Sequence, residues 1–562
     1  MMEFAEGWAQ DSCQSPSPFW HMVVAHVIPS VAMVAYALLA TFLLISFIEH
    51  LGYVSLRCQR SHKTDKGNGV LSPRTPTVCV QLPMFNEAAV ATRAIAAACQ
   101  LDWPRERLQI QVLDDSTDSA IRALVDDAIR TWRACNVNCC VIRREKRDGF
   151  KAGALEVGRK QTGAEFLALF DADFVPTPDF LRRVVPYFYD ADSQPHENLA
   201  LVQAQWSHLN PFESLLTFSQ SLWVDDHHVP QMQWRSAIWD FVNFTGTAGV
   251  WRASAIEAAG GWRATSLVED CELSFRVLFA GYRTVFVPVP VPAELPGSVT
   301  AYKAQQRRWT LGWAQLLRMH VGTLLYSYDC SSLKRFHLLY HMCLSIQWPL
   351  WCLWQLSMPF LVAVHGLDGW SLYFTPLLVY MAFSSFIAAF ELADRYKARL
   401  DSWGLPAPLQ FVVLVLRAVP SAMINSAMLP HQTCSWLDGM QSMNVEFETT
   451  PKRGSAPCES SKAIVDGGCS NERERLTRLV QRARVSRGYL VAELLYVAYH
   501  IAWALYFTLC GEQLSIVWSA LFPGLAVAIL CLFYGDDQAT PCCVEHAKRL
   551  TSKLLGCCNP QT

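Results

Sequence analysis

Long apolar blocks flank a central stretch in which apolar and polar positions are mixed. An almost uninterrupted apolar run covers residues 22–48, and further apolar runs recur after residue 330, whereas residues 76–320 carry short apolar runs between charged positions. About 20 consecutive apolar residues are enough to cross the hydrocarbon core of a bilayer. The pattern therefore predicts a soluble domain placed between membrane helices.

Within the central stretch, strand-like runs alternate with helical patterns. The strand-like runs are 77–82, 108–113, 139–143, 165–170, 199–205 and 284–288. Helical periodicity falls between several of them, for example over 118–133 and 153–161. Strands that alternate with helices predict an α/β fold, with a mostly parallel sheet and helices on both faces. We expect this domain to cover residues 76–320.

Basic residues give the orientation of the first membrane helix. Residues 1–21 contain no Lys or Arg, whereas Arg57, Arg60, Lys63 and Lys66 follow the apolar run. Because cytosolic flanks carry the excess of Lys and Arg, we expect the N-terminus outside the cell or in a lumen and the central domain in the cytosol. The length of the run and its lack of a basic start argue against a cleaved signal peptide.

The later apolar runs predict further spans, at about 338–364, 371–393, 490–510 and 513–534. One more run, 409–429, contains Arg417 and Pro420. A spanning helix there would bury a charge at a cost of about 2.5–3.5 kcal/mol. It would also put the basic segment 452–487 outside, against the positive-inside rule. We therefore interpret 409–429 as an interfacial or re-entrant helix, which leaves the tail 535–562 in the cytosol.

Composition narrows the class of protein. The 562 residues are 52% hydrophobic and 17% charged, which fits one or two soluble domains plus membrane helices. The formal net charge of -2 gives no argument for a nucleic-acid partner. The 20 cysteines show no zinc-type spacing, so we expect mostly reduced thiols. Two pairs in the tail, Cys542–Cys543 and Cys557–Cys558, suit S-palmitoylation about as well as unmodified thiols.

Two carboxylates directly follow one of the predicted strands. Phe166–Phe170 is a continuous apolar run, and Asp171 and Asp173 come next. Open α/β sheets bind ligands at the C-terminal ends of their strands. An Asp-x-Asp pair there suits Mg²⁺ or Mn²⁺, which prefer oxygen ligands and bridge phosphates. Taken alone, the pair fits helix or turn capping equally well.

Other polar residues are expected near the same sheet edge. Asp114 and Asp115 end the strand 108–113, where a carboxylate can accept a hydrogen bond from a nucleobase, and we favour this over a plain turn. For Asp118 we favour a helix N-cap. Lys151, with small neighbours at a helix start, suits a phosphate contact, although a surface lysine is the commoner explanation.

Two further motifs lie closer to the membrane. Glu269 and Asp270 precede an amphipathic stretch, either as first-turn acids of a helix or with one aspartate as the general base for an acceptor hydroxyl. Gln305, Arg308 and Trp309 combine a guanidinium that suits a diphosphate leaving group with an indole on which a sugar ring can stack. An interfacial helix has the same composition, and the two interpretations are compatible.

In this order, the motifs resemble the processive family 2 inverting glycosyltransferases, which include cellulose, mannan, chitin and hyaluronan synthases. The longer matches are similar to the cellulose-synthase-like A and C proteins. They are Gln81-Leu-Pro-Met-Phe-Asn-Glu, Gln111-Val-Leu-Asp-Asp-Ser-Thr-Asp, Phe150-Lys-Ala-Gly-Ala-Leu, Phe170-Asp-Ala-Asp-Phe, Leu201-Val-Gln-Ala-Gln-Trp and Gly246-Thr-Ala-Gly-Val-Trp. The resemblance implies a cytosolic domain of the GT-A type. It also implies that GDP-mannose or UDP-glucose is used to elongate, and to translocate, a β-1,4-linked mannan or glucomannan.

The resemblance also implies roles for single residues. We expect the nucleotide sugar to be bound by Asp114, Asp115, Lys151, Asp171, Asp173, Gln305, Arg308 and Trp309. Asp171 and Asp173 would hold the diphosphate through a divalent cation, Mn²⁺ or Mg²⁺, and Asp270, beside Glu269, would be the general base. Phe447, Thr450 and Lys452, within 444–454, resemble the gating loop of bacterial cellulose synthase.

The sequence departs from the family pattern at two positions. Thr245 stands where the cellulose-synthase-like A proteins commonly have Asn, and Val268 stands where Thr is usual. These departures leave the sugar and the acceptor open, so a β-glucan synthase and a non-processive enzyme acting on a lipid such as ceramide remain alternatives. Expected partners are the nucleotide sugar, the growing polysaccharide and membrane lipids, with a homo-oligomer left open. The Golgi membrane is the expected location, and the plasma membrane is the alternative.

Overall fold

The computed structural model describes residues 26–60, 75–190, 192–365, 400–443, 472–511 and 521–530, together with the short pieces 386–387, 389 and 396–397. The N-terminal residues 1–21, the gating-like loop 444–454 and the tail 535–562 lie outside the described residues, as does most of the predicted span 371–393.

A seven-stranded sheet forms the centre of the domain, with the strand order β3-β2-β1-β4-β6-β5-β7. Its strands are β1 (Val78–Met84), β2 (Leu108–Asp114), β3 (Cys139–Ile142), β4 (Phe166–Leu169), β5 (Leu199–His208), β6 (Gly249–Arg252) and β7 (Arg283–Ala293). β6 alone runs antiparallel to its neighbours, β4 and β5, and the other pairings are parallel. The predicted mostly parallel sheet is confirmed, but the sequence analysis missed β6.

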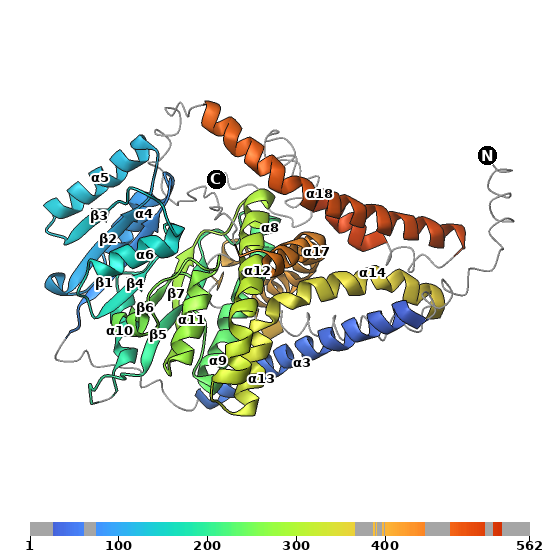
Figure 1. Cartoon of the computed structure of the whole chain (residues 1–562), viewed down its shortest axis with the longest axis horizontal. Helices are drawn as coiled ribbons and strands as arrows, with labels where there is room; N and C mark the ends of the chain where they lie inside the picture. Colours follow the sequence, from blue (N-terminus) through green and yellow to red (C-terminus); the bar gives the residue numbers. More distant parts are fainter. Residues whose placement is uncertain are drawn as a thin grey trace.

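Helices cover both faces of this sheet (Figure 1). They are α4 (Ala91–Cys99), α5 (Ser119–Ala134), α6 (Phe150–Lys160), α7 (Phe180–Val184), α10 (Ala253–Ala258) and α11 (Glu269–Phe279). Alternate residues of a strand point to opposite faces, so Val78 and Val80 of β1 join one buried apolar cluster with Ile95 of α4. Cys79 joins the other cluster with Leu155 of α6.

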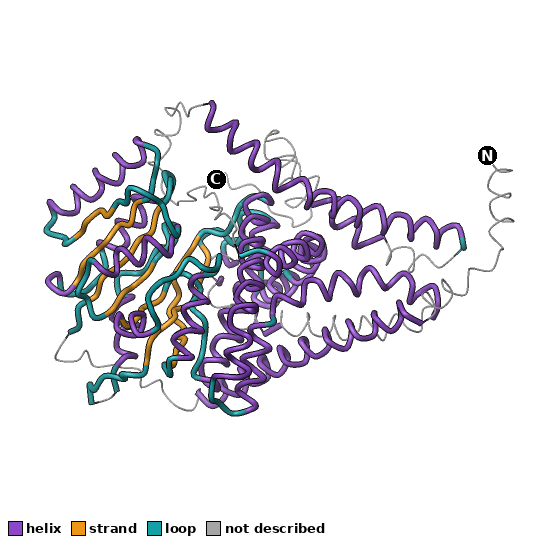
Figure 2. Tube along the Cα trace, viewed as in Figure 1, coloured by secondary structure: helices purple, strands orange, loops and turns teal. Residues whose placement is uncertain are grey.

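The remaining helices lie on the β7 side of the sheet, some of them packed directly against it (Figure 1 and Figure 2). They are α3 (Ile28–Arg60), α8 (Leu215–Asp226), α9 (Met232–Trp239), α12 (Val299–Gly322), α13 (Ser332–Met342), α14 (Gln347–His365), α16 (Ala407–Leu416), α17 (Ala418–Gln441) and α18 (Glu472–Leu509). A π-helical turn, η4 (His227–Gln231), joins α8 to α9. By length and composition, three described helical stretches can cross a membrane: Ile28–Arg57, Ala407–Gln441 and Gly488–Leu509.

Arg417, the residue that argued against a span at 409–429, has a buried partner. Its guanidinium donates to Oδ2 of Asp225 at 2.9 Å and to Oγ of Ser221 at 3.0 Å. Both partners belong to α8, so the junction between α16 and α17 is fixed to the chain that leaves the sheet. Length and composition admit a span here, and the interfacial interpretation stays a prediction.

Further ion pairs connect α9 and α12 of the domain to α3 and α18, which together with α14, α16 and α17 we call the membrane-side helices. Arg235 of α9 donates two hydrogen bonds to Glu49 of α3, at 2.7 and 3.0 Å, and both side chains are about 1% exposed. Lys303 of α12 contacts Glu493 of α18 at 2.6 Å. A buried charge is tolerated only when it is paired, so these contacts fix which helices adjoin and in which register.

Candidate active site

The parallel register brings several strand ends to one edge of the sheet. Met84 at the end of β1 lies opposite Asp114 at the end of β2, and Gln81 of β1 lies opposite Leu169 at the end of β4. The residues that follow β2 and β4 therefore emerge close together, as the sequence analysis expected. This is the edge at which open α/β sheets bind ligands.

The two acids after β2 differ in what they face. Asp114 is buried, accepts from Nε of Arg143 at 2.8 Å and accepts from the backbone N–H of Ser116 at 3.0 Å. Asp115 accepts from Arg144 and lines the cavity described below. Asp115 is thus the acid of this pair that a ligand can reach, whereas Asp114 orders the loop behind it.

The predicted N-cap is confirmed. The Asp118 carboxylate accepts from the backbone N–H of Ala120 at 2.8 Å and caps α5.

Lys151 lies beside the Asp-x-Asp pair. It occupies the first turn of α6, and its Nζ contacts Asp171 Oδ1 at 2.5 Å and donates to the Gly246 carbonyl at 2.9 Å. The neighbouring carboxylates outweigh burial, which acts in the opposite direction, and raise the pKa of Lys151 above its ordinary value. Asp173 is buried, whereas the Asp171 side chain is about 35% exposed. The structure therefore brings a permanent positive charge to the acids after β4.

Gly246 lets the backbone approach two of these groups closely. Its φ is +85°, and a Cβ there would lie 2.9 Å from Oδ2 of Asp270 and 3.5 Å from Nζ of Lys151. A side chain would therefore strain the backbone and displace a carboxylate. The requirement for close approach accounts for a glycine at this position.

Glu269 and Asp270 begin α11 close to Lys151 and Gly246, beside the sheet edge. Burial, together with nearby carboxylates, raises the pKa of both groups above the ordinary range, and Lys151 opposes this shift. A carboxyl with a raised pKa in a cavity is suited to accept a proton near neutral pH. The geometry fits the base predicted from the sequence, and it leaves open which of the two acids accepts the proton.

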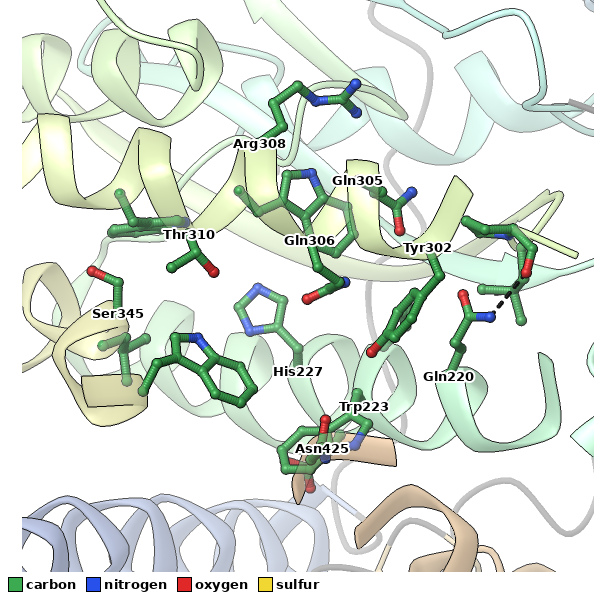
Figure 3. A pocket seen from close by; sticks show the side chains of 18 of the residues that line it. Gln220, Trp223, His227, Tyr302, Gln305, Gln306, Arg308, Thr310, Ser345 and Asn425 are labelled. Carbon is green, nitrogen blue, oxygen red and sulfur yellow. Dashed lines mark hydrogen bonds between the residues drawn. The ribbon is translucent and has the colours of Figure 1, made fainter. Parts of the chain in front are cut away.

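The helix α12 supplies the predicted Arg-Trp pair. Gln305, Arg308 and Trp309 line the cavity, and Figure 3 shows Gln305 and Arg308 projecting from this helix. Trp309 lies 6.3 Å from Trp206 at the end of β5, measured between ring centroids. Trp206 in turn stacks on His228 of η4 at 5.0 Å. The sequence analysis did not assign Trp206 and His228 to the site, although Trp206 ended one of the quoted motifs.

One cavity of about 1300 Å³ connects these groups. It is lined by Asp115, Lys151, Asp171, Asp173, Glu269, Asp270, Gln305, Arg308 and Trp309, among others. Further along, the cavity is lined by three tryptophans of α14, Trp348, Trp351 and Trp354, and by Phe507 of α18. The cavity therefore runs from the polar edge of the sheet to an aromatic zone among the membrane-side helices. Phe447, Thr450 and Lys452 lie outside the described residues.

The acids after β4 fit a cation that is shared with a ligand. Among the described residues, no group of three or more His, Cys, Asp or Glu side chains is arranged to hold a metal ion. Asp171 and Asp173 supply two carboxylates at the cavity wall. Mg²⁺ and similar cations commonly take one or two carboxylates and complete their coordination with substrate phosphates and water. The residues present are thus compatible with such an ion.

The parts of the chain that match known families include most of the polar residues that line this cavity. Residues 79–196 match the family described as Glycosyl transferase family 2, and residues 166–390 match Glycosyl transferase family group 2. Over these residues the chain is similar to glycosyl transferase family 2. The acids after β2 and β4 fall in the first match, and Glu269 to Trp309 fall in the second.

Two curated relatives come from Oryza sativa subsp. japonica. Over 280 residues the chain is 42% identical to a probable glucomannan 4-beta-mannosyltransferase 7 of Oryza sativa subsp. japonica, which covers 49% of this chain and 46% of that protein. Over 342 residues it is 36% identical to glucomannan 4-beta-mannosyltransferase 1 of the same organism, covering 57% of this chain and 64% of that protein. The chain thus spans about half to two-thirds of the length of these relatives.

Among solved structures, a mannosyltransferase from Pyrobaculum calidifontis in complex with GDP-Man and Mn²⁺ is similar to this chain. The two are 19% identical with a TM-score of 0.40, over 69% of this chain and 98% of that one.

Proposed function

We propose that this protein is a membrane-embedded inverting glycosyltransferase that transfers mannosyl residues from GDP-mannose to the end of a β-1,4-linked mannan or glucomannan. The observation that carries the proposal is that one continuous cavity joins the candidate residues. It joins the acids after β4, Lys151, a base candidate and an Arg-Trp pair to an aromatic zone among the membrane-side helices. The choice of mannose rests on the names of the curated relatives.

The sheet edge would bind the donor. Asp115 lies where a nucleobase N–H can reach it, and Asp171 and Asp173 would hold a divalent cation against the diphosphate. Such a cation, when bound, offsets the negative charge of the diphosphate. Lys151 supplies a further positive charge at the same place. Arg308 faces the cavity from α12 and would stabilise the departing diphosphate through charge-assisted hydrogen bonds.

Residues of α11 and α12 would hold the base and bind the acceptor. The terminal sugar of the acceptor would stack on Trp309, beside Trp206. Asp270 would take the proton from the acceptor hydroxyl as its oxygen forms a bond to the anomeric carbon of the donor. The bond from that carbon to the diphosphate breaks at the same time, and its electron pair leaves with the diphosphate. A single displacement inverts the configuration and needs no covalent sugar–enzyme intermediate.

The aromatic end of the cavity supports elongation with export. Trp348, Trp351 and Trp354 present indole rings where a chain leaving the acceptor site would pass, and sugar faces pack well on such rings. The proposal includes a catalytic domain in the cytosol of a Golgi or plasma-membrane enzyme. It also includes passage of the product between the membrane-side helices.

The test uses the purified full chain with GDP-mannose, UDP-glucose or other nucleotide sugars, each supplied alone with Mn²⁺ or Mg²⁺. We expect GDP-mannose to give a product that resists lipid extraction and is cut by a β-1,4-mannan hydrolase. Protein carrying Asp270→Asn serves as the control for background activity. A lipid-extractable product would indicate the lipid-acceptor alternative, and a product cut only by a β-glucan hydrolase would indicate a glucan synthase.

A further inference from the structure

The base candidate and the Arg-Trp pair come from different segments whose relative position must be fixed. Asp270 begins α11, whereas Arg308 and Trp309 belong to α12. The part of α12 that follows Trp309 lies between the loop ahead of Asp270 and the end of α17. Contacts at this three-part junction therefore determine how far the base lies from the groups that would hold the leaving diphosphate and the acceptor.

Glycines allow the three segments to pack closely. A Cβ at Gly312 of α12 would lie 2.6 Å from Cγ1 of Val268, in the loop ahead of Asp270. A Cβ at Gly439 of α17 would collide with the carbonyl oxygen of Leu311 and lie 2.8 Å from Cβ of Ala314. Side chains at either position would push the segments apart, so α12 is in close contact with both neighbours.

One buried side chain forms hydrogen bonds to both neighbours of α12. Gln315 is fully buried, and its Oε1 accepts from the backbone N–H of Leu267 at 3.1 Å. Its Nε2 donates to the carbonyl of Ser442 at 3.0 Å and to that of Met443 at 3.4 Å, directly after α17. Both polar atoms of the amide are satisfied by backbone groups. The contacts therefore constrain the path of the main chain on both sides of α12.

We propose that Gln315 is a positioning residue that holds the loop carrying Asp270 in register with Arg308 and Trp309. This inference rests on the proposed function. Gln315 follows Arg308 by seven residues, which is close to two helical turns, so the two side chains leave α12 on the same side. Loss of the amide leaves the Leu267 N–H without its partner in a buried place. The loop then moves to find another, and a displacement of about 1 Å at a reacting group can cost about 100-fold in rate.

The test compares Gln315→Met with Arg318→Met in the full-length protein. Methionine is close to glutamine in shape but makes neither hydrogen bond. Arg318, less than one turn further along α12, donates to the Gly439 carbonyl at 3.4 Å and so connects α12 to α17 without contacting the base loop. We expect Gln315→Met to lower kcat by about 10-fold to 100-fold with the donor KM within about twofold of wild type. Arg318→Met should leave both constants within about twofold.

A conservative variant separates positioning from packing. Gln315→Glu keeps the shape and the acceptor for Leu267, and in its protonated form it can also donate to Ser442. It should recover most of the lost kcat. If Gln315→Met fails to fold, Gln315→Asn replaces it, because the shorter amide cannot reach Leu267 and Ser442 together.

Two results would overturn the inference. Wild-type kcat in Gln315→Met with a lower unfolding temperature would show a structural role alone, and equal losses in Gln315→Met and Arg318→Met would show a general effect of helix packing. If the wild-type protein transfers no sugar, the proposed function fails and hydrogen exchange decides the inference instead. Gln315→Met should then speed exchange of the Leu267 amide, and Arg318→Met should not. Unchanged exchange at Leu267 in Gln315→Met would refute the contact.

Discussion

The sheet and its junction with the membrane-side helices are held together by different interactions. Inside the sheet domain, fully buried apolar side chains such as Leu167 and Val80 pack from both faces. At the junction, charges are paired, as in Glu49 with Arg235 and in Asp225 with Arg417. Apolar packing is non-directional and tolerates changes that conserve volume. A buried ion pair requires one geometry and penalises the loss of either partner.

The same difference applies to the cavity. Some of its lining residues follow strands of the sheet, and others lie on α12, which polar contacts hold in place. The residues that we propose bind the donor follow strands whose register is fixed by the sheet. Trp309 and Arg308 lie on α12, which is held from behind by Lys303 with Glu493 and by Arg307, which donates to the Tyr489 hydroxyl at 3.0 Å. Damage to the sheet edge should therefore affect donor binding, whereas damage at the junction should affect stability and the placement of the acceptor wall.

The largest expected effect tests the donor wall. Chelation of divalent cations should abolish transfer, because Asp171 and Asp173 place two carboxylates on the cavity wall where we propose that the diphosphate binds through a cation. Activity should return with Mn²⁺ or Mg²⁺. The measurement is transfer rate against free metal concentration. Full activity in excess chelator would show that positively charged side chains of the protein can bind the diphosphate without a divalent cation.

Two substitutions, measured side by side, separate an effect on turnover from an effect on nucleotide binding. Asp270→Asn keeps the shape but removes the base, so kcat should fall by roughly 10²–10⁴-fold while nucleotide-sugar affinity stays close to wild type. Asp173→Asn should instead weaken nucleotide binding, because Asp173 is a proposed ligand of the divalent cation. Calorimetry and transfer rates are measured for both variants. Loss of binding in Asp270→Asn with normal turnover at saturating donor would make Asp270 a binding residue.

The junction is tested by unfolding in detergent. Arg235→Met leaves Glu49 buried without its charge partner and should cost about 3–5 kcal/mol in free energy of unfolding. Adding Glu49→Gln removes that charge and should recover part of the loss. Leu167→Ala in the sheet core should cost about 2–5 kcal/mol through cavity formation, and Glu49→Gln should not offset it. If Glu49→Gln recovers the same free energy of unfolding in combination with Leu167→Ala as with Arg235→Met, the two regions do not differ in the way described.

The smallest expected effect is on pH dependence. A base must be deprotonated to act, and burial raises the pKa of Glu269 to about 7 and raises that of Asp270 as well. The transfer rate should therefore be full above the raised pKa and fall as the pH drops through it, by about tenfold per unit once below it. An ordinary aspartate would keep its rate down to about pH 4. A rate that is flat between pH 8 and about pH 5 would exclude a base with a raised pKa.

The local pattern of apolar and polar residues was enough to predict much of the fold and part of the candidate site. Alternating apolar runs and helical periodicity predicted the mostly parallel sheet, and the strand-end rule predicted that Asp115, Asp171 and Asp173 would share one edge. These predictions succeeded because they depend on neighbours in sequence and on a general property of parallel sheets. β6 was missed because it has four residues, lies in a glycine-containing motif and is inserted antiparallel between two longer strands.

Tertiary structure decided what depends on distant partners. It turned Asp114 away towards Arg143, stacked Trp206 on His228, and gave Arg417 a carboxylate 192 positions earlier in the chain. Sequence patterning reports whether a side chain is apolar or charged, but a charge is stable in a buried place only if a partner lies there. Which partner lies there is fixed by how the helices pack, and no local pattern contains that information.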